Sequence, residues 1–250
     1  MLDPETVPPS ALDADSLVIP DGLDLSFDGF GEEAFAVLDR LRAEPHIEQY
    51  RKEKEAVRRY LTDPFKRYRD DLAVNWVLPN RLDLETERNV FSRLLKNDFG
   101  AGGCHHHLWM AFYRPGLKRL TDVQLAHSIR PEGFEVGVFV GGYARPLVKA
   151  VRARIHDEPA RFLDLVNPLL QEACWLAWRT GSGAAARHGR ADAPLGAVPE
   201  GLLRADDLWL RCRFPRADVV AWRGALVRHV LGAVRTLWPV YRFMIRAEGR

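Results

Sequence analysis

The RPEG segment at residues 130–133 constrains the fold of this 250-residue chain more than any other stretch. Proline followed closely by glycine is typical of a tight turn, and the runs 121–129 and 134–140 on either side have the composition of strands. Three valines of the second run share one face of a strand: Val136, Val138 and Val140. The sequence therefore predicts an antiparallel hairpin at the centre of a sheet.

Helical periodicity occurs on both sides of this hairpin, whereas the middle of the chain alternates with a period of two. Helices are expected over 31–44, 45–61, 64–76, 145–155 and 159–173, and further strands over 90–96, 105–114, 173–179 and 208–214. The triplet Thr62-Asp63-Pro64 predicts that one helix ends and the next begins, because Asp63 can cap and Pro64 suits a first helical position.

The C-terminal helix carries one continuous apolar stripe, which has to pack against a folded body. The residues of this stripe are Val219, Trp222, Leu226, Val230, Val234 and Leu237. We therefore expect a single α+β domain over residues 26–250, in which a mainly antiparallel central sheet is packed by N-terminal helices and a long C-terminal helix.

Charge is distributed unevenly between the two parts of the chain. Residues 1–35 contain nine Asp or Glu and no Lys or Arg, so residues 36–250 carry a formal charge of +11 within a total of +2. We expect residues 1–25 to form a flexible acidic lead, which could dock on a protein partner. The Gly-, Ala- and Pro-rich residues 181–201 are expected to form a flexible loop.

Composition excludes several classes of protein. No apolar run approaches the ~18 residues of a membrane span, and the acidic N-terminus lacks the basic start of a secretory signal. The three cysteines, Cys104, Cys174 and Cys212, are widely spaced and odd in number, so no disulfide framework is expected. These features predict a reduced cytoplasmic protein without a membrane partner.

Four segments together resemble a widespread conserved family catalogued as a domain of unknown function. They are FDGFGEEAFAVLDRL, NVFSRLLKNDF with its Ser-Arg pair, SIRPEGFEVGVFVGGYARPLVKAVRARI with its hairpin, and LWLRCRF followed by the helix that reaches Pro239. The resemblance covers about residues 27–245 and implies a fold, but it implies no activity. The Lys-x-Pro-Tyr-Lys block that the family carries after its Ser-Arg strand is absent, and GAGGCHHH stands in its place.

The histidines of GAGGCHHH suggest a metal site as one hypothesis. On a strand, His105 and His107 point to the same face, and His127 with Asp98 could complete a set of ligands for zinc or another divalent metal. This set would make the chain a metal-dependent hydrolase. The alternative is that the glycines form a tight surface connection that allows positive φ, with the histidines at the rim of the sheet and Trp109 in the core.

Our leading functional hypothesis is a binding protein without an assigned reaction, which holds an anionic ligand, a nucleotide or nucleic acid, in a cleft beside the sheet. Arginine binds phosphate with two parallel hydrogen bonds, and the basic body of the chain favours polyanions. The residues expected to contact the anion are Arg93, Lys96, Arg130 and Arg145. A scaffold protein within a larger complex is the third hypothesis, and the sequence does not decide whether the chain is an enzyme.

Overall fold

One six-stranded antiparallel sheet organises the computed structural model, which describes residues 6–246. The spatial order is β1-β2-β3-β6-β4-β5. The strands are β1 (Leu108–Phe112), β2 (Gln124–Arg130), β3 (Gly133–Val140), β4 (Cys174–Thr180), β5 (Arg187–Ala191) and β6 (Asp207–Pro215). The predicted hairpin is β2–β3, in which Arg130 pairs with Gly133, and the α+β architecture with a mainly antiparallel sheet is confirmed.

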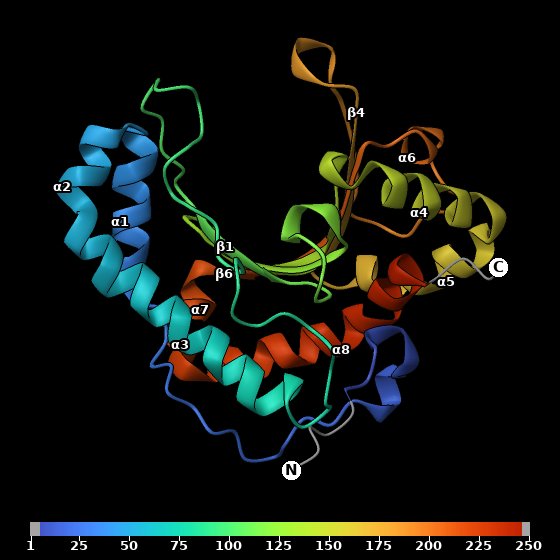
Figure 1. Ribbon diagram of the computed structural model, residues 1–250, viewed down its shortest axis with the longest axis horizontal. Coiled ribbons are helices and arrows are strands. Elements are labelled where there is room, and N and C mark those ends of the chain that lie inside the picture. The colour runs from blue at the N-terminus through green and yellow to red at the C-terminus, as the bar shows by residue number, and fades with distance from the viewer. Residues whose placement is uncertain (1–5, 247–250) are drawn as a thin grey trace.

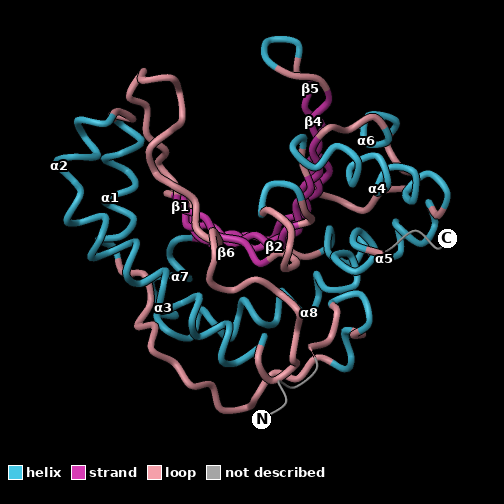
Figure 2. The backbone as a smooth tube through the Cα atoms, viewed as in Figure 1, coloured by secondary structure: helices cyan, strands magenta, loops and turns pink. Residues whose placement is uncertain are grey.

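Helices cover one face of the sheet and flank it on both sides, with α1 and α2 beside β1 and α4 to α6 beside β4 (Figure 1). The sheet is a curved band whose convex face lies against α8, α7 and α3, while its hollow face opens away from them (Figures 1 and 2). The helices are α1 (Glu32–Ala43), α2 (Ile47–Val57), α3 (Asp63–Leu72), α4 (Arg145–Asp157), α5 (Pro159–Gln171), α6 (Glu200–Leu203), α7 (Arg216–Trp222) and α8 (Leu226–Ile245). Within residues 6–246, no helix is long and apolar enough to cross a membrane.

The C-terminal stripe forms the centre of the core, as its periodicity predicts. Val230, Val234 and Leu237 of α8 are almost completely buried against the convex face. Trp238 of α8 packs edge-on against Trp76, with ring centroids 5.7 Å apart. Burial of such large side chains contributes about 1.5–3 kcal/mol each, so α8 is a principal source of stability.

The break predicted at Thr62-Asp63-Pro64 does not occur, and this prediction was wrong. A π-helical turn, η3 (Arg58–Thr62), joins α2 to α3 without interruption, and a second one, η4 (Ala73–Val77), extends α3. The backbone N–H of Asp63 donates to the carbonyl of Arg58, five residues earlier. The wider turn accommodates Pro64, which cannot donate the hydrogen bond of a regular α-helix.

Residues 6–25 differ from the flexible lead that the acidic composition predicts, while residues 1–5 lie outside the described residues. The segment packs along the helical layer (Figure 1). The Asn80 side chain accepts from the N–H of Val18 at 2.7 Å, and the indole N–H of Trp238 donates to the carbonyl of Leu12 at 2.8 Å. Composition describes the charge of this segment, but buried side chains of the turn after η4 and of α8 hold it in place.

Residues 181–201 are also more ordered than a loop. They contain β5, which pairs with β4, and the first residues of α6. Gly189 is required here because a Cβ at this position would meet the indole ring of Trp178 at 2.1 Å. The segment 181–201 therefore starts as the tip and second strand of a β-hairpin arm, continues as an irregular loop over 192–199 and ends at the first residues of α6.

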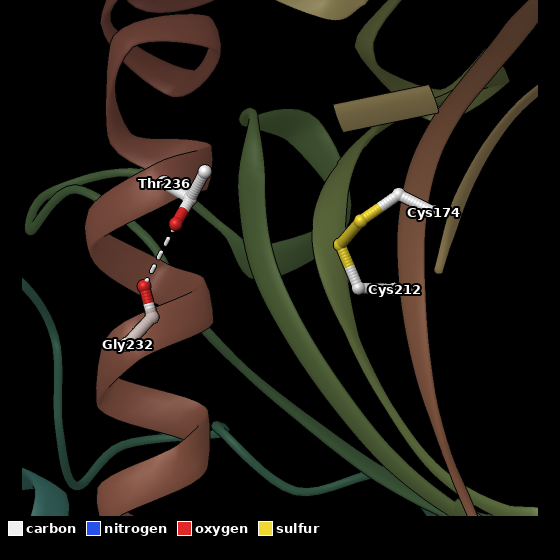
Figure 3. Close-up of a disulfide and its surroundings, with 4 residues drawn as sticks. All are labelled: Cys174, Cys212, Gly232 and Thr236. Carbon is white, nitrogen blue, oxygen red and sulfur yellow. Dashed lines mark hydrogen bonds between the residues drawn. A yellow bond between two sulfur atoms is a disulfide. The ribbon is translucent and has the colours of Figure 1, made fainter. Parts of the chain in front are cut away.

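A disulfide joins the two strands β4 and β6, contrary to the expectation that no disulfide forms. Cys174 and Cys212 are direct cross-strand partners and both are buried, while Cys104 is a buried free thiol. Figure 3 shows the bond beside α8, in which the Thr236 hydroxyl donates to the carbonyl of Gly232. The two cysteines are 38 residues apart in sequence, and only the strand order brings them together.

Candidate functional site

The hollow face of the sheet is the candidate site. The strand register arranges its side chains in rows that run across the strands. One row holds Trp109, Ser128, Glu135 and Arg213, the next Ala111, Ala126, Gly137 and Arg211, and the third Gln124, Phe139 and Trp209. The middle row therefore has small side chains on the neighbouring strands β1, β2 and β3, and it lies between two rows that contain larger side chains.

This small middle row produces a cavity of about 860 Å³, with Ala126 and Gly137 on its floor. A Cβ at Gly137 would come within 2.2 Å of the carbonyl oxygen of Leu210, so β6 approaches too closely for any other residue. The volume is within the range of small-molecule sites, and apolar and aromatic side chains form much of the lining.

Three arginines share one buried carboxylate in the wall of this cavity. Glu135 forms an ion pair with Arg130 at 2.9 Å and accepts hydrogen bonds from Arg211 at 3.2 Å and from Arg213 at 3.0 Å. Burial alone would raise the pKa of Glu135, but the three guanidinium groups outweigh burial and hold that pKa below its ordinary value. The cluster keeps two uncompensated positive charges, and Arg130 and Arg211 line the cavity.

An aromatic stack positions Arg211. The rings of Phe139 and Trp209 stack with centroids 3.7 Å apart, and the guanidinium of Arg211 lies 3.6 Å from the centroid of Trp209. Burial lowers the pKa of Arg211 to about 10, with Glu135 opposing and Arg130 adding to the effect. Its Nε has no hydrogen-bond partner. A cation that is held in this way is preorganised for an anion, because little side-chain entropy remains to be lost.

The opposite end of the cavity lies at the start of α4. Arg179 pairs with Asp207, and the same carboxylate accepts from the backbone N–H of Gly142 at 2.6 Å. Arg145, the first residue of α4, is exposed and also lines the cavity. Within residues 6–246 no ion pair joins Arg145 to a carboxylate, so its charge is available to a ligand.

His107 lies at the other rim, just before β1. Burial lowers its pKa to about 3, with Arg130 and the neighbouring histidines adding to the effect, so the imidazole is neutral at pH 7. Its Nδ1 is buried without a hydrogen-bond partner. His107 lines the cavity, whereas the ring of His105 lies 5.1 Å away by centroids and is not among the lining residues.

The structure does not bring the four predicted metal ligands together. His127 points to the opposite, helix-covered face, where its Nδ1 lies 2.9 Å from the hydroxyl of Tyr68. Asp98 accepts from the backbone N–H groups of Gly102 and Gly103 within the connecting turn. In the part of the chain that the structure describes, no three His, Cys, Asp or Glu side chains group around a common point.

The GAGG stretch is a tight connection with positive φ at Gly100 and Gly102, as the alternative interpretation predicts. The strand expected over 90–96 is reduced to two isolated bridges, Phe91 with Met110 and Leu95 with Cys104. Trp109 corrects a further prediction. It lies on the hollow face, with Arg119 4.3 Å from its ring centroid, instead of inside the core.

Of the predicted anion contacts, two line the cavity and two do not. Arg130 and Arg145 lie at its opposite ends, whereas Arg93 and Lys96 are exposed and lie outside it. Glu135, Arg211 and Trp209 were not among the residues that the sequence predicted. The alternation in LWLRCRF, residues 208–214, places Trp209, Arg211 and Arg213 on one face of a strand and was the signal that could have identified them.

No family model and no curated protein matches this chain.

Proposed function

We propose that the protein binds an anionic ligand, a nucleotide or nucleic acid, in the cavity on the hollow face of the sheet. The observation that carries this proposal is the cluster of Arg130, Arg211 and Arg213 around the single carboxylate of Glu135. Two excess positive charges in a partly desolvated wall attract an anion more strongly than charges in open water do.

The remaining lining supports the same ligand class. Trp109, Phe139 and Ala126 provide apolar surface on which a planar ring can lie, while Ser128 and the neutral His107 provide hydrogen-bonding groups. Mostly apolar cavities with a few convergent polar groups are typical of small-molecule and cofactor sites. The proposal is a binding function and assigns no catalytic residue.

Tryptophan fluorescence provides a direct test, because Trp109 and Trp209 both line the cavity. Titration with adenosine monophosphate should change this fluorescence saturably. Arg211→Gln should weaken the binding about tenfold or more, since a hydrogen bond to a charged group contributes about 1.5–3 kcal/mol. Arg51→Gln is the matched control, because Arg51 forms an exposed ion pair with Glu48 on α2. Equal affinities for the two variants would contradict the proposal.

Three further predictions stay proposals. A cytoplasmic location is expected from the sequence, but the Cys174–Cys212 disulfide counts against it because disulfides are rare in a reducing cytosol. Cell fractionation, with free thiols blocked at lysis, would test both the location and the disulfide.

A protein partner at the acidic N-terminal segment and a bound divalent metal are the other two proposals. A pull-down would test the partner, and metal analysis of protein prepared without an affinity tag would test the metal.

A further inference from the structure

A second hollow adjoins the cavity and opens over one side of α4. It has a volume of about 470 Å³ and shares Gly142, Arg145 and Arg179 with the cavity of the candidate site. The two hollows are therefore neighbours, with these three residues at the boundary between them.

This second hollow is basic. Arg145, Lys149 and Arg152 are spaced four and three residues apart, so they share one side of α4. Arg152 donates to the backbone carbonyl of Ala205, while the only acidic lining residue, Asp206, accepts from the backbone N–H of Gly181. Within residues 6–246 no ion pair neutralises Arg145, Lys149 or Arg152. The charge faces the hollow without a carboxylate partner.

The positive groups form a long track. On β6, Arg213 of the arginine cluster is six residues beyond Asp207, the partner of Arg179, which corresponds to about 20 Å along a strand. From Arg145 to Arg152, seven residues of helix add about 10 Å. The acidic N-terminal segment lies on the other side of the molecule, beyond the sheet and α8 (Figure 1), and does not neutralise this track.

Positive groups spread over a strand and a helix in this way exceed the reach of a single nucleotide, whose charges all lie in one short phosphate chain. A linear polyanion with regularly spaced phosphates matches it. Aromatic surface lies along the first cavity at Trp109, Phe139 and Tyr143, and Tyr143, next to Gly142, which both hollows share, is 78% exposed. Proteins that bind single strands combine a basic groove with aromatic rings for the unpaired bases, whereas a duplex keeps its base faces stacked inside.

We propose that the ligand is a single strand of nucleic acid, which runs from the Arg130–Arg211–Arg213 cluster across the sheet and along α4 past Lys149. This inference rests on the proposed function and assigns its ligand class.

The test uses a fluorescein-labelled 12-nucleotide strand of deoxythymidine and fluorescence anisotropy over a series of salt concentrations. About five phosphate contacts predict a log–log slope of affinity against salt of about −3.5, at ~0.7 per contact on a single strand. Lys149→Glu should reduce that slope by about 0.7 and weaken binding several-fold. Lys54→Glu, an exposed lysine on α2 away from both hollows, is the matched control and should leave binding unchanged.

Tyr143→Ala separates base contacts from charge alone. It should weaken the 12-nucleotide strand several-fold, because stacking on an exposed ring is lost. It should not change the binding of inorganic polyphosphate of similar charge. A duplex of the same length should bind more weakly than the single strand.

Several results would overturn the inference and leave the proposed function intact. Binding of the strand that is insensitive to both Lys149→Glu and Tyr143→Ala, combined with sensitivity to Arg211→Gln, would restrict the ligand to the first cavity. If deoxythymidine monophosphate binds as tightly as the strand, the ligand is likewise restricted to the first cavity. A duplex or polyphosphate that equals the strand would exclude base recognition. Insensitivity of every anion to Arg211→Gln would refute the proposed function and this inference together.

Discussion

Replacement of Glu135 by glutamine tests the electrostatic argument most directly. The change keeps the shape of the side chain but removes the only carboxylate shared by Arg130, Arg211 and Arg213. Opposite charges 3 Å apart attract by about 5 kcal/mol at an effective dielectric constant of ~20, but desolvation and the mutual repulsion of the arginines offset much of the attraction.

The expected loss of unfolding free energy follows from the exposure of the partners. Breaking a buried ion pair costs about 3–5 kcal/mol. Glu135 has a side-chain exposure of only 4%, but Arg211, Arg130 and Arg213 have exposures of 19%, 24% and 40%, so solvent screens part of the repulsion that remains. We therefore expect Glu135→Gln to lose about 3 kcal/mol.

Urea denaturation at pH 7 and low salt measures this loss. Glu132→Gln is the control, because Glu132 lies in the turn of the same hairpin and forms an exposed pair with Arg42, worth about 0–1 kcal/mol. Pyrophosphate should restore stability to Glu135→Gln more than to the wild-type protein, since the freed guanidinium groups bind it. A loss below about 1 kcal/mol, or no greater restoration by pyrophosphate, would refute the charge cluster as described.

Three further predictions concern stability. Burial lowers the pKa of His127 to about 3, so the folded state binds fewer protons than the unfolded state below the ordinary pKa of ~6.5. The contribution of His127 to stability should therefore be fully present above pH 6.5 and fall as the pH decreases toward 3. The urea midpoint should depend less on pH in His127→Gln than in the exposed control His156→Gln. Reduction of Cys174–Cys212, which closes a loop of 38 residues, should cost about 3–4 kcal/mol, measured as the change in urea unfolding with and without reductant; mass spectrometry that finds both thiols free in unreduced protein would contradict the pairing. Phe112→Ala in the core should cost about 3–5 kcal/mol, and Trp109→Ala on the hollow face clearly less; the reverse order in thermal or urea unfolding would mean that Trp109 is a core residue.

Local patterns were sufficient for most elements of the fold. The RPEG turn identified β2 and β3, and the apolar stripe from Leu226 to Leu237 identified α8, because both depend on residues that are close in sequence. The expected continuation of that helix back to Val219 was wrong, because positive φ at Arg223 separates α7 from α8. The break expected at Pro64 failed because a π turn, which local composition does not reveal, accommodates the proline. The flexible lead expected over residues 6–25 differs for another reason: the contacts of this segment come from the turn after η4 and from α8, far along the chain.

The site depended on information that no local pattern contains. Alternation showed that His107 and Trp109 share a face, but the chain does not say which face of a strand the helices will cover. Strand order places Arg130, Arg211 and Glu135 together across β2, β3 and β6, and places Cys174 beside Cys212. The residues before and after His127 face the hollow side of the sheet, but the pleat of the strand turns His127 itself toward Tyr68. The sequence by itself determined the elements and the basic character of the body. Only the tertiary structure decided which charges converge, because pairing between distant strands sets their distances.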